Sequence, residues 1–210
     1  MRQGGRFISL EGGEGVGKST QLHALAAALH ERGIDCLTTR EPGGSDGAER
    51  IRELLLAGSD DRWGPQAEAL LFAAARTDHV DKVIRPALDA GRWVLCDRFI
   101  DSSLAYQGGA GGLGIEAVRR INRFGIGDIM PDRTLVLVLD GEQGADRANV
   151  RDGEGRDRIG GRSADYHARV EAAFRIIAAE DSERVHLINA SGSEEEVTRR
   201  LVHALADLLP

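Results

Sequence analysis

This sequence lacks an excess of positive charge, because its 27 basic residues are outnumbered by 34 acidic ones, and this lack excludes one large class of partner. The formal net charge at pH 7 is -7. Proteins that bind a nucleic-acid polymer rely on a basic surface that releases counterions from the phosphate backbone. We therefore exclude a nucleic-acid polymer as the main partner. Any phosphate that the protein binds must be held by cations gathered in one place.

Long hydrophobic runs and cysteines are also scarce. No run approaches the roughly 18 apolar residues that a membrane span needs, and the N-terminus has no apolar core of signal-peptide length. The only cysteines, Cys36 and Cys96, each lie in a short apolar stretch, which favours buried free thiols over a disulfide or a metal pair. We expect a soluble protein of the reducing cytoplasm with no membrane partner.

Three absent patterns narrow the chemistry. The six histidines show no metal-ligand spacing, so we assign no metal site that protein ligands alone complete. The sequence offers no Ser/His/Asp constellation for nucleophilic catalysis. It also lacks the Asn-Lys-x-Asp motif that reads guanine.

Short apolar runs that end in polar residues alternate with longer amphipathic stretches along the 210 residues. This alternation predicts one α/β domain (residues 1–210) with a five-stranded parallel sheet flanked by helices in three layers. Strands are expected over 6–11, 34–39, 92–97, 133–140 and 184–189. Helices are expected over 18–31, 46–57, 65–90 (bent or divided), 99–107, 114–125, 141–149, 163–180 and 193–208. Such sheets bind ligands at the carboxyl ends of their strands.

A glycine-rich segment lies between the first expected strand and the first expected helix. It matches G-x-x-x-x-G-K-[ST], a P-loop whose glycines let backbone N–H groups turn inward around phosphate oxygens. The lysine supplies charge to the β- and γ-phosphates, and the serine offers a hydroxyl to Mg²⁺. The plainer alternative is a loop that only turns a strand into a helix. We predict an ATP site formed by Gly12, Gly13, Glu14, Gly15, Val16, Gly17, Lys18, Ser19 and Thr20.

Two acidic residues end later strands. Asp97 ends the third expected strand and is followed directly by Arg98. A carboxylate there is placed like a Walker-B acid, which holds Mg²⁺ directly or through water, and the arginine can neutralise a second phosphate. The alternative is a strand-end salt bridge. Asp140 ends the fourth strand and ranks second because no basic residue follows it. The predicted metal ligands are therefore Ser19 and Asp97, partly through water.

Two groups of side chains have the spacing of a nucleoside site. Phe72 and Arg76 stand four residues apart and share a helix face, so they can stack on a base and bond its edge. The alternative is that the ring is core and the arginine pairs with a surface carboxylate. Ser103, Tyr106 and Gln107 offer a hydroxyl, a phenol and an amide about one turn apart, which can read a sugar or a base edge.

Two further stretches have the composition of loops. Residues 108–114 are rich in glycine, which by itself predicts only a mobile or tightly turned connection. Residues from about 147 to 162 combine arginines with Gly, Asp and Glu and have few apolar anchors. That composition is typical of a small mobile lid, with a disordered charged loop as the alternative. Its arginines are Arg147, Arg151, Arg156, Arg158 and Arg162.

The P-loop, the Asp-Arg pair and the arginine-rich lid occur together in small kinases that phosphorylate nucleoside monophosphates. The chain resembles the thymidylate kinase family, from Phe7 almost to the C-terminus. The resemblance implies the P-loop kinase fold and ATP-dependent phosphorylation of dTMP to dTDP with Mg²⁺. Its more specific motifs are Arg40-Glu41-Pro42-Gly43-Gly44, Phe72 with Arg76, Asp97-Arg98-Phe99 and Ser103-Leu104-Ala105-Tyr106-Gln107-Gly108.

The resemblance implies a role for each matching position. On the donor side, Lys18 and Ser19 hold the ATP phosphates and Mg²⁺, and Asp97 serves the same ion. The residues implied for dTMP are Glu14 near the 3′-hydroxyl, Arg52 and Arg98 on the phosphate, Phe72 and Arg76 on the thymine face and edge, Ser103 and Gln107 on the base, and Tyr106 against a 2′-hydroxyl.

One catalytic group is missing from the P-loop. Some members of the family carry an arginine at the positions occupied here by residues 13–16, and others supply it from the lid; this chain has none in the loop. The resemblance therefore implies a lid arginine; Arg151, Arg156 and Arg158 are the candidates, and Arg156 and Arg158 rank first because they lie in the middle of the lid. The chain also departs from the family at Gly160-Gly161, where an acidic residue is usual, and at Gly111, where arginine is frequent.

Two other functions stay open at this point. One is a small kinase for a different nucleoside monophosphate, and the other is a nucleotide-dependent switch or assembly protein. The lack of a guanine-reading motif argues against the switch, which also has no use for Phe72, Arg76 and Gln107. The resemblance further implies a homodimer formed through helices of the 46–125 region. The sequence does not predict whether the protein prefers dTMP to dUMP.

Overall fold

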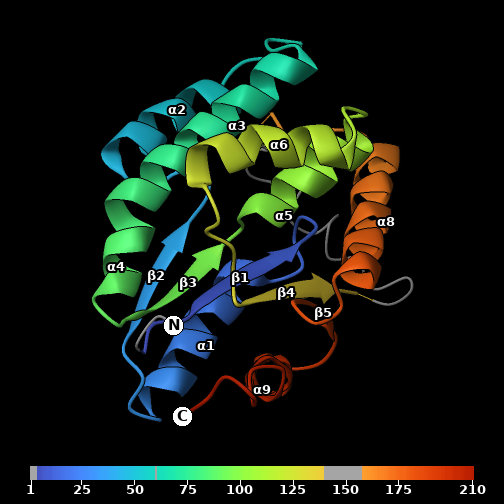
Figure 1. The fold of residues 1–210 in the computed structure, drawn as a ribbon. Coiled ribbons are helices and arrows are strands. Elements are labelled where there is room, and N and C mark those ends of the chain that lie inside the picture. The colour runs from blue at the N-terminus through green and yellow to red at the C-terminus, as the bar shows by residue number, and fades with distance from the viewer. Residues whose placement is uncertain (1–3, 60, 140–157) are drawn as a thin grey trace.

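The computed structural model of the chain describes residues 4–59, 61–139 and 158–210. Its centre is one parallel sheet of five strands in the order β2-β3-β1-β4-β5 (Figure 1). The strands are β1 (Phe7–Gly12), β2 (Cys36–Arg40), β3 (Trp93–Asp97), β4 (Arg133–Val138) and β5 (Val185–Asn189). Every residue of β1 and β4 is buried, as expected for strands that are covered on both faces. The predicted α/β fold is confirmed.

Helices cover both faces of the sheet. On one side lie α1 (Lys18–His30) and α9 (Glu194–His203), with α1 presenting Leu22, Leu25 and Leu29 to the core (Figure 1). The opposite side holds the longer set: α2 (Asp46–Leu56), α3 (Pro65–His79), η1 (Val80–Ile84), α4 (Arg85–Asp89), α5 (Ile100–Ser103), η2 (Leu104–Ala110), α6 (Ile115–Ile126) and α8 (Ala164–Glu180). None of the helices in the described part of the chain is long and apolar enough to cross a membrane.

Most expected elements lie within a few residues of the observed ones. The expected division of the helix over 65–90 is confirmed, because the π-helix η1 separates α3 from α4. The helix expected over 99–107 begins as α5 and continues as the π-helix η2. The helix expected over 141–149 lies outside the described residues. Both cysteines are free thiols; Cys96 is buried, whereas Cys36 is only half-buried.

The glycines at 108–114 form less of a loop than their composition predicts. Gly108 and Gly109 belong to η2, and only Gly112 and Gly114 have positive φ, at 75° and 86°. A Cβ added to Gly109 would lie 2.6 Å from the Cβ of Ala173 on α8. The glycine therefore lets η2 and α8 pack in close contact, which brings α8 beside the carboxyl ends of the strands.

Candidate active site

The P-loop joins the buried strand β1 to α1. Gly12 has a φ of 134°, and a Cβ there would lie 2.5 Å from the carbonyl oxygen of Leu137. Gly17 begins α1 in the left-handed conformation, with a φ of 93°. Both positions require glycine, so the backbone turns tightly and the helix N-terminus faces the loop. Lys18 is 7% exposed, and its Nζ donates to the Gly13 carbonyl oxygen at 2.5 Å.

One cavity of about 330 Å³ extends from this loop to the helices on the opposite side of the sheet. The predicted residues that line it are Glu14, Gly15, Gly17, Lys18, Ser19, Thr20, Arg52, Phe72, Arg76, Asp97, Arg98, Ser103, Tyr106 and Gln107. Residues predicted for the donor and acceptor halves therefore share one cavity. The predicted residues that do not line it are Gly12, Gly13, Val16 and Arg158. Arg156, Asp140, Arg147 and Arg151 lie outside the described residues.

The predicted metal ligands are adjacent. Ser19 Oγ donates a hydrogen bond of 2.8 Å to Asp97 Oδ2, where β3 ends beside the start of α1. A hydroxyl and a carboxylate are among the hard oxygen ligands that Mg²⁺ prefers, and Mg²⁺ usually keeps several waters besides. Both residues line the cavity next to Lys18. The donor set fits a magnesium ion held partly through water.

Arg98 connects the P-loop to the acceptor half. Its φ is 69°, which is unusual for a residue other than glycine. Its Nη1 donates to the Gly12 carbonyl oxygen at 2.9 Å and to Ser102 Oγ at 3.1 Å, and its Nη2 donates to Glu14 Oε1 at 2.6 Å. Its guanidinium lies 5.1 Å from the ring centroid of Tyr106. These contacts fix a cation at the boundary between the two halves of the cavity.

Glu14 is placed between cations. Tyr106 donates its hydroxyl proton to Glu14 Oε1 over 3.2 Å. Burial alone would raise the pKa of the Glu14 carboxyl, but Arg98 and Lys18 together hold that pKa below its usual value. The carboxylate therefore stays ionised and can accept a hydrogen bond from a sugar hydroxyl.

The sequence interpretation missed Glu11. Its carboxylate is buried and accepts from the Phe99 amide at 2.7 Å and from Ser102 Oγ at 2.5 Å. Burial, reinforced by the nearby Asp101 carboxylate, raises the pKa of Glu11 to about 8. Its contacts fix the turn that carries Arg98. The signal for it was present, because a glutamate inside the buried strand β1 needs buried partners.

Burial also sets the charge of Lys18. Burial, with the neighbouring Arg98 guanidinium adding to it, lowers the pKa of the Lys18 ammonium from 10.5 to about 8. Phosphates bound beside Lys18 would favour the charged form and raise that pKa, so the predicted ATP binding would take up a proton above about pH 8. We expect ATP affinity to fall by up to about tenfold per pH unit above that value. Calorimetry at pH 7 and pH 9, in buffers with different ionisation enthalpies, measures both effects; equal affinity at the two values would contradict this expectation.

Arg76 is held on every side of its guanidinium. Its Nε donates to Glu41 Oε2 at 2.7 Å, its Nη1 donates to Ser103 Oγ at 3.0 Å and to Asn122 Oδ1, and its Nη2 donates to the Phe99 carbonyl oxygen at 3.0 Å. The side chain is 2% exposed. Its carboxylate partner is thus buried, and the alternative of a surface pairing is wrong. Little freedom remains for Arg76 to move within the cavity that it lines.

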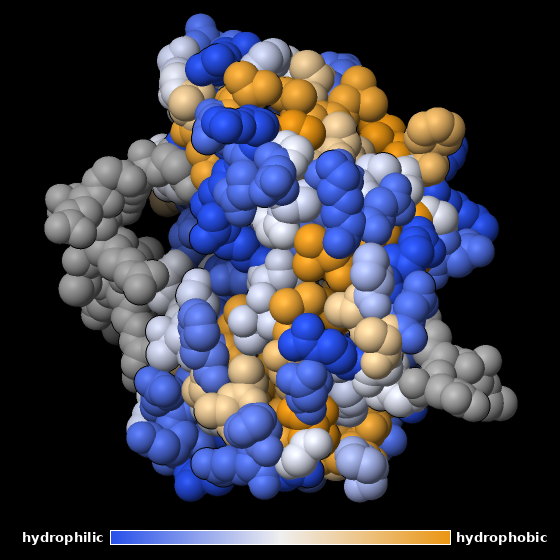
Figure 2. All heavy atoms as spheres, turned by 90° about the vertical axis from the view of Figure 1, so that its left-hand side faces the viewer, coloured by the Kyte–Doolittle hydropathy of each residue, from blue (hydrophilic) through white to orange (hydrophobic). Residues whose placement is uncertain are grey.

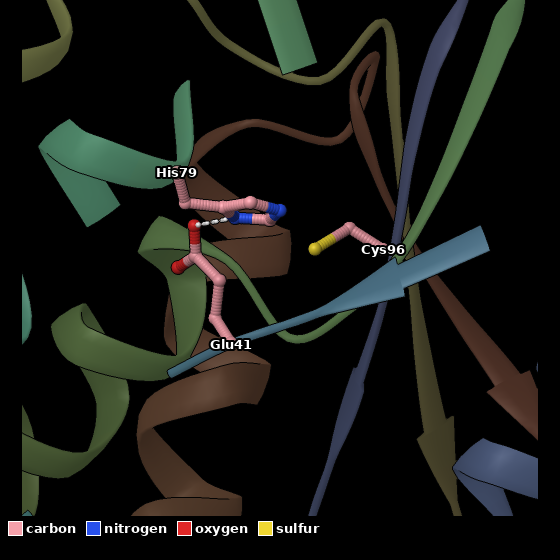
Figure 3. A group of neighbouring side chains, drawn as sticks. All are labelled: Glu41, His79 and Cys96. Carbon is pink, nitrogen blue, oxygen red and sulfur yellow. Dashed lines mark hydrogen bonds and ion pairs between the residues drawn. The ribbon is translucent and has the colours of Figure 1, made fainter. Parts of the chain in front are cut away.

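A group of potential metal ligands lies behind Arg76. Oxygen, nitrogen and sulfur atoms of Glu41, His79 and Cys96 lie within 4.8 Å of one another (Figure 3). His79 Nδ1 shares a hydrogen bond of 3.0 Å with Glu41 Oε1, and its Nε2 shares one of 2.7 Å with Thr39 Oγ1. The second oxygen of Glu41 accepts from Arg76. Since both ring nitrogens and both carboxylate oxygens have protein partners, we interpret the group as a support for Arg76.

A second support stands beside the amide of Gln107. Glu68 is 3% exposed and accepts from Gln107 Nε2 at 2.9 Å. It also accepts from Arg158 and Arg162, each at 2.6 Å. The turn that carries these two arginines contains Gly160-Gly161, one of the departures from the family pattern. The other departure, Gly111, ends η2, where an added Cβ would lie 2.8 Å from the Gln107 carbonyl oxygen.

The parallel sheet, the P-loop and the facing nucleoside-sized cavity define a P-loop kinase of the kind that acts on small nucleotides. The family profile for thymidylate kinase matches residues 10–201. The chain belongs to the thymidylate kinase family.

Individual relatives agree over nearly the full length. A thymidylate kinase of Rhizorhabdus wittichii is 60% identical over 206 residues, which cover 98% of this chain and 99% of the relative. One from Bradyrhizobium diazoefficiens is 50% identical over 208 residues, which cover 98% and 91%. The crystal structure of thymidylate kinase from Ehrlichia chaffeensis matches with a TM-score of 0.79 at 31% identity, over 96% of this chain and 99% of that chain.

Proposed function

We propose that this single domain binds ATP on the P-loop and dTMP in the facing half of the cavity, between Phe72 and Gln107. The reaction is the ATP-dependent phosphorylation of dTMP to dTDP. One observation carries the assignment of the sites: the buried Lys18 and the helix that holds Phe72 line the same cavity of about 330 Å³, with Arg98 between them. A phosphate cradle and a base-sized slot therefore face each other.

Phosphoryl transfer asks for alignment and for fixed positive charge more than for covalent work by the protein. We propose that Lys18 binds the donor phosphates while Arg98 and Arg52 bind the acceptor phosphate. Arg52 lines the cavity, and its Nη1 donates to the Pro42 carbonyl oxygen at 2.8 Å. Ser19 and Asp97 would hold Mg²⁺, which when bound neutralises phosphate charge. Tyr106 and Glu14 would contact the deoxyribose.

Thymine recognition is assigned to three elements of the described chain. Phe72 lies on α3, is partly buried against the core and lines the cavity, so its ring can stack on the base. Arg76 and Ser103 hydrogen-bond to each other at the base end of the slot. Gln107, on η2, completes this end with an amide. The side chains would hold the base in one plane.

A coupled assay for ADP release tests the function against its alternatives. With ATP present, we expect rapid ADP formation when dTMP is added and much slower formation with dCMP, dGMP or AMP. Strong activity with one of these others would favour a different monophosphate kinase. ADP release at the same rate without any acceptor would favour a nucleotide-dependent switch, and would overturn the proposal.

We also propose a homodimer formed through the 46–125 region and a cytoplasmic location. Large apolar side chains are exposed there: Leu54 on α2 at 42%, Leu70 on α3 at 56% and Phe124 on α6 at 97%. Figure 2 shows hydrophobic side chains gathered over the upper part of the face that carries α2 and α3. Exposed apolar area of this kind is typical of interaction surfaces. Sedimentation of the purified protein at twice the monomer mass of 22.6 kDa would support the dimer.

Arg158 is better explained as an anchor than as the transferring arginine. Its side chain is fully buried, with Nε donating to the Leu55 carbonyl oxygen at 2.8 Å and Nη2 donating to Glu68. We therefore propose Arg156 as the lid residue that contacts the transferring group. Arg158→Ala removes one of the two arginines that pair with the buried Glu68 carboxylate. We expect this loss to lower the free energy of unfolding by about 3 kcal/mol.

Denaturant unfolding of Arg158→Ala and Arg156→Ala measures this difference. Arg156→Ala should unfold like the unchanged protein and lose turnover. A folded Arg158→Ala of normal stability that has lost turnover would reverse the two roles.

A further inference from the structure

The two carboxylate oxygens of Glu68 have different partners. Oε1 accepts from the Nε2 of Gln107 at 2.9 Å, whereas Oε2 accepts from Arg158 and Arg162 at 2.6 Å each. The residue is 3% exposed. Since the arginines hold one oxygen, the other is fixed toward Gln107. Glu68 is thus a buried acceptor that faces the base-reading amide from behind.

This contact decides which end of the Gln107 amide faces the cavity. A carboxylate can only accept hydrogen bonds, so it binds the NH₂ end of the amide and leaves the carbonyl end turned away. No donor among the described residues hydrogen-bonds to Gln107 Oε1, although Gln107 lines the cavity. One N–H of Nε2 is committed to Glu68, so the group of the amide without a protein partner is the acceptor Oε1.

The arginines are held in place as well. Nη1 of Arg162 donates to the Tyr166 hydroxyl at 2.5 Å, and that hydroxyl donates to the Tyr106 carbonyl oxygen at 2.8 Å. These bonds tie the turn over residues 158–162 to η2, the same helix that carries Gln107. Glu68 cannot rotate without breaking contacts on both sides. Its orientation is therefore built into the packing of α3, η2 and α8.

We propose that Glu68 is a positioning residue for base selectivity: by holding Gln107 Nε2, it presents Oε1 to the Watson–Crick edge of the acceptor base. Thymine carries an N–H donor at N3, whereas cytosine carries an acceptor there. A fixed carbonyl oxygen accepts a hydrogen bond from the N3–H of thymine. Opposite cytosine, two acceptors face each other without a proton between them, and an unpaired acceptor is costly in a buried site. This inference rests on the proposed function.

Glu68→Gln is the sharpest test because it hardly changes shape. Arg158 and Arg162 can only donate hydrogen bonds, so the amide oxygen of the substituted side chain accepts from them. Its NH₂ group then faces Gln107. Gln107 must then turn its own oxygen inward and present Nε2 to the base. We expect the ratio of kcat/KM for dTMP to that for dCMP to fall by about tenfold or more, mainly through KM for dTMP. KM for ATP should stay unchanged.

Three further variants make the result specific. Glu171→Gln changes an exposed carboxylate on α8, which pairs with Arg175, and should leave the ratio unchanged. Glu68→Asp keeps a pure acceptor and should keep most of the preference for dTMP. In a Gln107→Ala background, Glu68→Gln should change the ratio by less than about twofold, because coupled residues act non-additively.

The outcomes separate this inference from the proposed function. Unchanged protein that fails to phosphorylate dTMP would overturn the proposed function. Active protein whose dTMP preference survives a folded Glu68→Gln substitution would overturn the inference alone. A loss of preference in Glu68→Asp as large as in Glu68→Gln would also overturn it, since only one of the two variants supplies a donor. Circular dichroism checks that each variant is folded.

Discussion

Replacement of Lys18 by alanine is expected to lower kcat by about 10³-fold, with the protein still folded. Lys18 is 7% exposed and lies at the N-terminus of α1, so its charge acts where water screens it little. The P-loop amides and the helix N-terminus remain in the variant, and we expect them still to bind phosphate. The loss should therefore be larger in kcat than in the affinity for ATP.

The chain supplies a matched control, because Lys82 is its other lysine. Lys82 pairs with Asp78 at 2.6 Å on the surface, and its side chain is 59% exposed. Lys82→Ala removes the same charge from a residue that does not line the cavity, and it should keep full turnover. Steady-state kinetics on both variants, with thermal unfolding alongside, measure the effect. Turnover by Lys18→Ala within tenfold of the unchanged protein would contradict the assigned role.

Arg98→Ala is expected to lower kcat/KM for dTMP by about 10²- to 10³-fold. The guanidinium donates to the Gly12 carbonyl oxygen and to Glu14, so its loss removes the cation between the proposed ATP and dTMP sites and takes a partner from the Glu14 carboxylate. The affinity for ATP should change much less, because Lys18 is still present. Arg98→Lys should recover only part of the activity, since an ammonium cannot make the planar forked contacts of a guanidinium.

Arg119 is a suitable control for this experiment. It is an exposed arginine on α6 that pairs with Glu116 one turn away. Arg119→Ala should leave both kinetic constants unchanged, since exposed pairs contribute little. An equal rise of the KM for ATP and of the KM for dTMP in Arg98→Ala would show that Arg98 supports the whole loop and does not act on the acceptor.

The backbone geometry of the P-loop was predictable because its signals are local. Gly12, Gly17 and Lys18 stand at fixed offsets, and the turn and the helix N-terminus follow from that spacing. Asp97 and Arg98 were predictable because parallel strands end at one edge of a sheet. The layers of the fold followed from alternating apolar runs, and the assigned ranges missed the observed strands by only a few residues.

The supports behind the acceptor half were not predictable in the same way. Glu68 and Arg158 stand 90 residues apart, and Arg76 meets Glu41 and Asn122 across 35 and 46 residues. Spacing along a chain does not reveal such pairs, because they form only when separate helices pack. Arg158 was predicted to be a catalytic candidate because it is charged and lies in an arginine-rich stretch. The structure instead gives its charge a buried partner.

The close contact between Gly109 and Ala173 has an evolutionary consequence. With 2.6 Å between an added Cβ at 109 and the Cβ of Ala173, the two positions together admit one methyl group. An alanine at 109 becomes acceptable only if position 173 has already become glycine, so the two sites should vary as a pair among relatives. A lineage that changed residue 109 alone would push apart η2 and α8, and with them the amide of Gln107 and the turn that steadies Glu68.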